Sequence, residues 1–423
     1  MKQHAVIRPT ALVGLSFAFI APAMAEEEET LFPVPVLGGD AWTRDVMTGD
    51  WGGTRQKLAD NGIQIDVSLH QYYQSVVDGG RDIDDWGDNG SLDFRLKLDT
   101  DKAGWWPGGF IEIHGETYYG TPANRYGGGL MPVNTDYVLS APDGEGTYLS
   151  HVVVMQFLSE TFGVFFGKLD TTVGDANSFA HGSGDEKFQN LAFSFNPVTL
   201  MAAPYSTLGA GMIWLPSEGI TVSASAYDLE GDISTSGFDT VWEDGTGYNV
   251  EVQFATNFFG QPGHQLFGVT YAEGDFTALN DPRIILPPLM AMTEGSTWNA
   301  YYNFEQHLSH DPKTGEGWGV FGRVGIADED TNPIPLFLSA GIGGTGLIPG
   351  RPIDRFGIGY YYLEVSDELP GLLLDGSEQG VELFYEVAVT PWFRVAADLQ
   401  FIEPALKTAD NATVFSLRST LTF

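Results

Sequence analysis

Apolar and polar residues alternate in many short stretches of this chain, and the alternation has a period of two. Between Leu92 and Leu98 every second residue is apolar, and each residue in between is charged. A period of two puts the apolar side chains on one face of a β-strand and the charged ones on the other face. The same pattern recurs at residues 63–69, 111–116, 248–254 and 393–401. The pattern therefore predicts an all-β protein.

The alternating stretches can be counted along the whole chain. They are 63–77, 90–99, 110–119, 147–158, 162–170, 205–215, 219–228, 247–257, 264–272, 297–308, 317–326, 336–343, 355–365, 379–389, 392–401 and 413–423. Connections after odd-numbered stretches are often long (120–146, 171–204, 273–296), and several after even-numbered ones are short (159–161, 390–391). Long loops on one side and short turns on the other are typical of porins. We therefore predict an antiparallel barrel of about 16 strands. Counts of 14 or 18 fit the same pattern with shifted boundaries.

A soluble β-sandwich also alternates, and three further features favour a transmembrane barrel instead. Tyr and Trp collect at the ends of the stretches, as in the aromatic girdles of membrane barrels. They occur at Tyr72-Tyr73, Trp105-Trp106, Tyr118-Tyr119, Trp298, Trp318, Tyr360-Tyr361-Tyr362 and Trp392. The stretches have about the length that a tilted strand needs to cross a bilayer. The chain also ends on an alternating strand with Phe423, which resembles the signal that the barrel-assembly machinery reads.

Composition excludes several classes of function. Acidic residues outnumber basic ones by 56 to 20, giving a formal net charge of -36, and the chain has no cysteine. Nucleic acid is an unsuitable partner, because binding phosphates needs clustered Lys and Arg. Without cysteine there are no disulfides, thiolate metal sites or cysteine nucleophiles.

The N-terminal residues predict export. Lys2 and Arg8 precede an apolar stretch that ends near Ala23-Met24-Ala25, a small-x-small cleavage pattern. We therefore expect a signal peptide at residues 1–25. A periplasmic lead-in should follow at 26–62, with a short helix within 53–61, and a transmembrane barrel at 63–423.

Two motifs resemble those of a known family. The opening motif runs from Gly49-Asp50-Trp51-Gly52-Gly53-Thr54-Arg55 to Asn61-Gly62-Ile63. The closing motif comprises Tyr385, Thr390-Pro391-Trp392, Asp398-Leu399-Gln400-Phe401-Ile402 and Pro404, and Trp106-Pro107-Gly108-Gly109 also fits. Both resemble the carbohydrate-selective porins of the OprB family. The resemblance implies a channel of the Gram-negative outer membrane through which sugars, glucose above all, diffuse into the periplasm.

A barrel of this size leaves a water-filled lumen, which the polar face of each strand should line. The constriction needs polar groups of both signs that replace the hydration of a sugar. The candidates are Arg95, Lys97, Glu112, His114, Glu116, Tyr118, Arg323, Arg394 and Asp398. Residues 171–187 are expected to fold inward, or to form an exposed lid. For any single candidate, the alternative is that it only solvates the wall.

No cofactor or metal is expected. Asp82, Asp84, Asp85 and Asp88 crowd the first outer loop, but their spacing does not match the helix-loop-helix calcium pattern, so a solvated acidic rim is expected. His307 and His310 are three residues apart, which in a regular strand puts them on opposite faces.

The expected partners are sugar solutes, outer-membrane lipid and the barrel-assembly machinery. A monomer and a homotrimer are both open. Two other functions compete with sugar passage. A general porin with this negative charge would favour cations, and an outer-membrane hydrolase would need a Ser-His-Asp site at the outer rim.

Overall fold

A computed structural model describes residues 31–81, 86–138, 145–172, 177–281, 283, 292–312, 314–369, 371 and 374–423. The expected signal peptide lies outside the described residues, as do Asp82, Asp84 and Asp85 of the acidic rim. Among the described residues, no helix is both long enough and apolar enough to cross a membrane.

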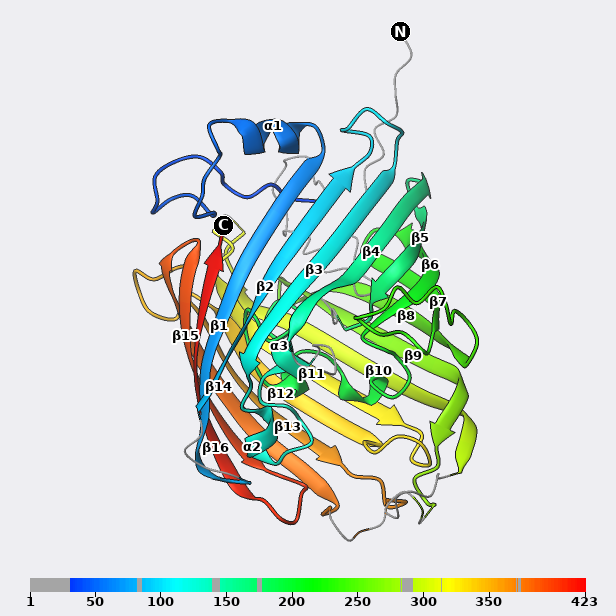
Figure 1. The fold of residues 1–423 in the computed structure, drawn as a ribbon. Coiled ribbons are helices and arrows are strands. Elements are labelled where there is room, and N and C mark those ends of the chain that lie inside the picture. Colours follow the sequence, from blue (N-terminus) through cyan, green and yellow to red (C-terminus); the bar gives the residue numbers. More distant parts are fainter. Residues whose placement is uncertain are drawn as a thin grey trace.

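Sixteen antiparallel strands close into one barrel (Figure 1). They are β1 (Ile63–Gly80), β2 (Trp86–Asp99), β3 (Gly109–Thr121), β4 (Gly146–Ser159), β5 (Phe162–Asp170), β6 (Ser206–Ser217), β7 (Ile220–Asp228), β8 (Gly245–Phe258), β9 (Gln261–Thr277), β10 (Thr293–His310), β11 (Gly317–Ala327), β12 (Leu336–Thr345), β13 (Arg355–Glu364), β14 (Ser377–Thr390), β15 (Phe393–Glu403) and β16 (Asp410–Thr422). Each strand pairs with its neighbours in sequence, and β1 pairs with β16. The predicted barrel and its count of 16 are confirmed.

The outer face of the barrel is the apolar face of the alternation. Leu92 and Phe94 on β2 are exposed, whereas Asp93 between them is buried. Trp86, Trp298 and Trp318 are exposed, as a girdle requires. The prediction was wrong for one member of several tyrosine runs, because adjacent residues of a strand point to opposite faces. Tyr72 and Tyr361 are buried inside the barrel, as is Tyr118, which was also predicted for the inner face.

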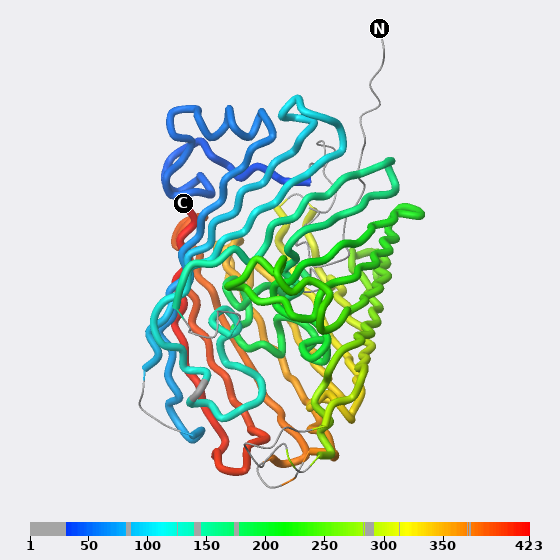
Figure 2. Tube along the Cα trace, turned by 45° about the vertical axis from the view of Figure 1, so that its right-hand side comes forward, coloured from blue at the N-terminus to red at the C-terminus, as the bar shows by residue number. Residues whose placement is uncertain are grey.

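A short helix packs at the end of the barrel where β1 pairs with β16. Helix α1 (Thr54–Asp60) precedes β1 and agrees with the helix predicted within 53–61. The buried Arg55 on this helix donates to the carbonyl of Ile65 on β1 at 2.8 Å and to the carbonyl of Phe423 after β16 at 2.9 Å. Its guanidinium also lies 5.0 Å from the ring centre of Trp51. The opening motif therefore fastens the first strand to the end of the last one. Figure 2 shows these N-terminal residues, in blue, gathered beside the C-terminus.

Arg55→Ala is expected to destabilise the barrel. Hydrogen bonds from a charged donor contribute about 1.5–3 kcal/mol, and the variant loses both of them. Urea unfolding in lipid vesicles should show a free energy of unfolding lower by about 3–6 kcal/mol, the sum for two such bonds. Lys57→Ala, at an exposed position of the same helix, is the matched control. Equal stability of the two variants would contradict the role assigned to Arg55.

Two long connections lie inside the barrel instead of outside it. We call residues 122–138 the short inward segment and residues 177–205 the long inward segment. The short one contains α2 (Asn124–Gly127) and α3 (Thr135–Val138), and the long one contains the 3-10 turns η1 (Leu191–Phe193) and η2 (Pro197–Thr199). Backbone hydrogen bonds join the two segments, from Thr135 to the carbonyl of Gln189 and from Leu191 to that of Pro132. The described part of 171–187 is thus folded inward and does not form a lid.

An apolar core lies within the barrel, between the long inward segment and strands β11–β14. Phe188 and Phe193 of the segment pack against the inward-facing Phe321, Tyr361 and Phe384. Glycines of β13 make room for them, since a Cβ on Gly359 would lie 2.5 Å from the Phe193 ring and one on Gly357 2.7 Å from the Phe188 ring. The expectation of a polar lumen all around is therefore wrong on this side.

A smaller apolar cluster covers another part of the inner wall. Leu31 and Phe32 reach the inward-facing side chains of Met155, Phe157 and Ile213 on β4 and β6. The residues before α1 are therefore packed against the inside of the barrel at their described N-terminal end.

A bulge changes the expected geometry at the end of β10. The pairing register between β10 and β11 shifts between His307 and Ser309. As a result, the rings of His307 and His310 lie 5.0 Å apart between their centres. The prediction that these histidines occupy opposite faces was wrong. The bulge adds one residue to the strand between them, and both side chains therefore lie on the same side.

Candidate functional site

The long inward segment is held by buried polar side chains of the barrel wall. Arg323 on β11, 1% exposed, donates to the carbonyls of Phe193, Ala180 and Ser194. Glu382 on β14 accepts hydrogen bonds from the backbone of Gln189 and Asn190. These contacts fix the segment to one side of the lumen. The remaining passage is therefore bounded by the segment and the opposite wall.

Strands β2 and β3 form one charged wall of this passage. Arg95, Lys97 and Glu112 are half-buried and point inward. Lys97 pairs with Asp66 on β1 at 3.1 Å. The carboxylates that act electrostatically on Arg95 are those of Asp93, Asp185, Glu112 and Glu116. This mixed wall carries both signs of charge, with carboxylates in excess.

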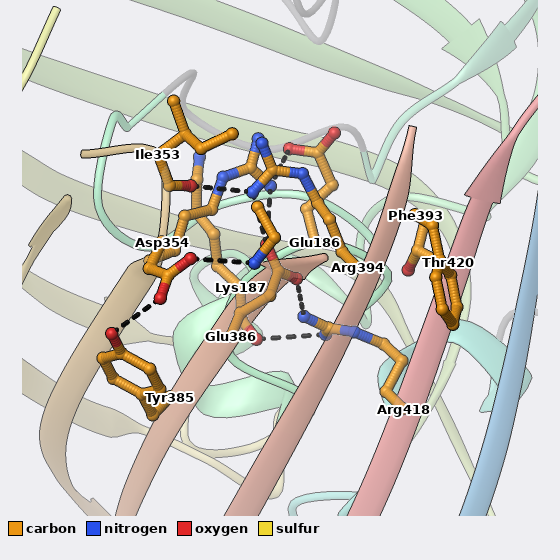
Figure 3. A network of polar contacts seen from close by, with 12 residues as sticks. Glu186, Lys187, Ile353, Asp354, Tyr385, Glu386, Phe393, Arg394, Arg418 and Thr420 are labelled. Atoms are coloured by element: carbon orange, nitrogen blue, oxygen red, sulfur yellow. Dashed lines mark hydrogen bonds and ion pairs between the residues drawn. The ribbon is translucent and has the colours of Figure 1, made fainter. Parts of the chain in front are cut away.

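Strands β13 to β16 form an arginine wall around one buried carboxylate (Figure 3). Glu386, 1% exposed, lies 3.1 Å from Arg394 and 3.5 Å from Arg355 through Oε1, and 3.0 Å from Arg418 through Oε2. Arg418 is buried and also donates to the carbonyls of Gly184 and Lys187. Arg355 and Arg394 are half-buried. Three guanidinium groups on one carboxylate leave positive charge facing the passage.

Two acidic residues of the long inward segment lie between the walls. Asp185 lies 3.9 Å from His70 on β1 and acts electrostatically on both Arg95 and Arg355. Glu186 lies 3.3 Å from Arg355. Arg355 holds the pKa of the Glu186 carboxyl well below its usual value, so Glu186 is ionised at neutral pH. The segment thus carries negative charge to the arginine wall.

The nine residues predicted for the constriction fall into three groups. Arg95, Lys97, Glu112 and Arg394 are half-buried on the two walls. His114, Glu116 and Tyr118 are buried on β3, where Tyr118 donates to Glu116 at 2.9 Å. Arg323 and Asp398 are buried beside the long inward segment, Arg323 as its anchor and Asp398 as an acceptor from Gln400 at 3.1 Å.

Sequence reasoning did not choose Arg355, Glu386 or Arg418 for the constriction, and it covered Asp185 and Glu186 only as part of the segment 171–187 that was expected to fold inward. Alternation puts the first three on the inner face of their strands, and this was the available signal. Their convergence on one carboxylate follows from the register of β13 to β16, which pairs Arg355 with Glu386 and Ala396 with both Glu386 and Arg418. Asp185 and Glu186 reach the site only because their segment folds inward.

Comparison with known proteins gives both a family and a fold. Residues 85–423 match the carbohydrate-selective porin, OprB family; this range includes the closing motif and begins after the opening one. Porin B of Pseudomonas aeruginosa is 22% identical over 422 residues, covering 88% of this chain and 90% of that protein.

Two solved structures share the fold. The high-pH structure of Pseudomonas putida OprB superposes with a TM-score of 0.77 at 23% identity, covering 91% of this chain and 99% of that one. The low-pH structure of the same protein has a TM-score of 0.57 at 17% identity, covering 91% and 100%.

A closed 16-strand barrel with an apolar exterior and charged walls inside is the architecture of a porin. The family match covers most of the chain. The chain belongs to the carbohydrate-selective porins of the OprB family, and it is an outer-membrane sugar porin, not an enzyme.

Proposed function

We propose that neutral sugars of about the size of glucose diffuse through a constriction between the mixed wall and the arginine wall. The observation that carries this proposal is the meeting of half-buried groups of both signs, with Asp185 acting on Arg95 and on Arg355. The constriction consists of Arg95, Lys97, Glu112, Arg355, Arg394, Asp185 and Glu186. All of these residues come from one chain, so a single barrel is sufficient.

The chemistry of these groups suits a polyhydroxylated solute. Guanidinium groups donate hydrogen bonds and carboxylates accept them, whereas a sugar hydroxyl does both. A sugar between the walls can therefore exchange its water contacts for protein contacts in small steps, without a site deep enough to retain it. Arg323 has no part in this path, because it is committed to the inward segment, and the buried Asp398 is committed to Gln400.

Arg95→Ala is expected to weaken the sugar-dependent block of single-channel current. A hydrogen bond from a charged donor is worth about 1.5–3 kcal/mol, which corresponds to a half-blocking glucose concentration about 10- to 100-fold higher. Lys407→Ala removes a cation at an exposed position between β15 and β16. Glucose should block the current through this variant at the same concentration as in the wild type. Unchanged glucose block in Arg95→Ala, with equal folding of both variants, would remove Arg95 from the constriction.

We further propose that residues 1–25 are removed as a signal peptide and that residues 26–62 form a lead-in at the periplasmic end, with Leu31 and Phe32 reaching inside the barrel. In this arrangement α1 and the C-terminus mark the periplasmic end. The barrel-assembly machinery would read β16 and Phe423. Support comes from the cleavage pattern at Ala23-Met24-Ala25 and from the short turns at the same end as α1.

A further inference from the structure

A cluster of histidines and carboxylates lies on the inner wall behind the passage. We call it the histidine–carboxylate cluster; it comprises His70, Asp93, His114, Glu116 and Asp185. Nε2 of His114 lies 2.8 Å from Oδ1 of Asp93 and 3.9 Å from Oε1 of Glu116. Nε2 of His70 lies 3.6 Å from Oδ2 of Asp93. One ligand atom from each of Asp93, His114 and Glu116 lies within 4.8 Å of the others. Such separations fit around one small cation.

Both histidines are oriented with Nε2 toward Asp93 by a hydroxyl group at Nδ1. Nδ1 of His114 lies 3.2 Å from Oγ of Ser150 on β4. Nδ1 of His70 lies 3.2 Å from Oγ1 of Thr420 on β16. When Nδ1 carries the proton and donates a hydrogen bond to the hydroxyl oxygen, Nε2 is unprotonated and can offer its lone pair to a cation. This arrangement is how metal-binding histidines are fixed by their outer partners.

Glu116 is held in place by two tyrosines. Tyr118 donates to Oε1 at 2.9 Å, and Tyr205 of the long inward segment donates to Oε2 at 2.6 Å. Both bonds fix the carboxylate with Oε1 turned toward His114. Hydrogen-bonded carboxylates of this kind are usual among metal ligands.

A second observation points to a ligand independently of the arrangement of the carboxylates. Nε2 of His70 and Oδ2 of Asp93 are buried, and neither has a hydrogen-bond partner among the residues that the structure describes. His70 as a whole is only 2% exposed. Leaving such polar atoms unsatisfied in a buried place destabilises the protein. A cation between them would satisfy both.

The charge around the cluster also favours a cation. Asp93, Glu116 and Asp185 all interact with the guanidinium of Arg95, which also interacts with Glu112, and Asp185 interacts in addition with Arg355. Asp136 of α3 adds a further buried carboxyl, and burial together with Asp93 and Asp185 raises the pKa of Asp136 well above its ordinary value. Buried carboxylates in excess of their partners are costly unless protons or cations compensate them.

We propose that the histidine–carboxylate cluster binds one divalent transition-metal cation, with Zn²⁺ as the best chemical fit. Two imidazoles and two carboxylates are a donor set that zinc accepts with four ligands, whereas calcium and magnesium prefer oxygen alone. The ligands would be Nε2 of His70 and of His114 with Asp93 and Glu116. Asp185 lies beside the passage, 3.9 Å from Nε2 of His70, so a cation could reach the cluster from the passage through this carboxylate. Neither spacing in the sequence nor the acidic rim predicted this site.

The test is isothermal titration of tag-free, detergent-solubilised full-length protein with ZnCl₂, after treatment with a chelator and gel filtration. We expect about one Zn²⁺ per chain and, with CoCl₂ as the probe, visible absorption typical of tetrahedral cobalt. His70→Gln and Asp93→Asn should each weaken Zn²⁺ binding at least about tenfold. MgCl₂ should give no saturable heat.

His310→Gln is the matched control, because it removes a histidine from a separate pair at the end of β10 and should leave zinc binding unchanged. Folding of every variant is checked by its heat-dependent migration in electrophoresis. Absence of saturable Zn²⁺ binding, equal binding in His70→Gln, or loss of binding only in His310→Gln would each overturn the proposal. The titration contains no sugar, so this proposal and the sugar constriction can fail separately.

Discussion

Replacing residues 178–203 by a short Gly-Ser link is expected to raise the single-channel conductance by about two- to fivefold, since ion flow scales with the open cross-section of a wide pore. The long inward segment fills the side of the lumen next to β10–β16, where Arg323 and Glu382 bind it. Asp170 and Ser206 are paired across β5 and β6, so a short link closes this hairpin without strain on the strands.

The same replacement should abolish the saturable block of current by glucose, because Asp185 and Glu186 leave with the segment. Lys407→Ala, which alters a connection at the rim, should keep both the conductance and the block of the wild type. A deletion variant that folds and conducts like the wild type would show that the segment lies outside the path of ions.

Glu386→Gln is expected to lower the free energy of unfolding by about 3–5 kcal/mol, the usual cost of removing one partner from a buried ion pair. Glu386 is the carboxylate shared by Arg355, Arg394 and Arg418, and its loss leaves three cations close together, of which Arg418 is fully buried. The variant should also shift the reversal potential in a salt gradient toward anions, because it removes one negative charge beside the passage.

Urea unfolding in lipid vesicles and reversal potentials in planar bilayers measure these two effects. Asp410→Asn, which removes an exposed carboxylate at the start of β16, is the control for the change in charge. If Glu386→Gln and Asp410→Asn unfold at the same urea concentration, the arginine wall does not depend on Glu386.

Alternation was sufficient to find all sixteen strands, because lipid and water impose opposite preferences on alternate residues of a strand. It found even β12, a short strand with small residues. It also put Arg95, Lys97, Glu112 and Arg394 on the inner face. Alternation shows which face of the strand each side chain occupies, because successive side chains point to opposite faces.

The apolar packing inside the barrel could not be predicted from alternation. Alternation assumes that apolar residues face lipid and polar residues face the lumen, and an apolar residue on the inner face breaks that assumption. In β13 the inner positions 357, 359, 361 and 363 are Gly, Gly, Tyr and Leu, and they pack against Phe188 and Phe193 from a distant segment. Such a strand is apolar on both faces and looks like the core of a soluble protein. Inward-facing glycines on one strand, together with a phenylalanine-rich connection elsewhere in the chain, are the sequence signal for this packing.

The role of Arg323 was missed for a related reason. An inward charged residue can face water or bind backbone carbonyls, and local sequence is the same in both cases. Arg323 binds three carbonyls because residues 177–205 return across the lumen, which no local pattern encodes.

The most direct test of the account is osmotic swelling of liposomes that contain the purified porin, compared between glucose and gluconate. We expect fast swelling in glucose and at least about tenfold slower swelling in gluconate of nearly equal size, because the net charge of -36 gives the channel a field that repels anions. Equal rates for the two solutes, or no swelling in glucose, would contradict a passage built for neutral sugars.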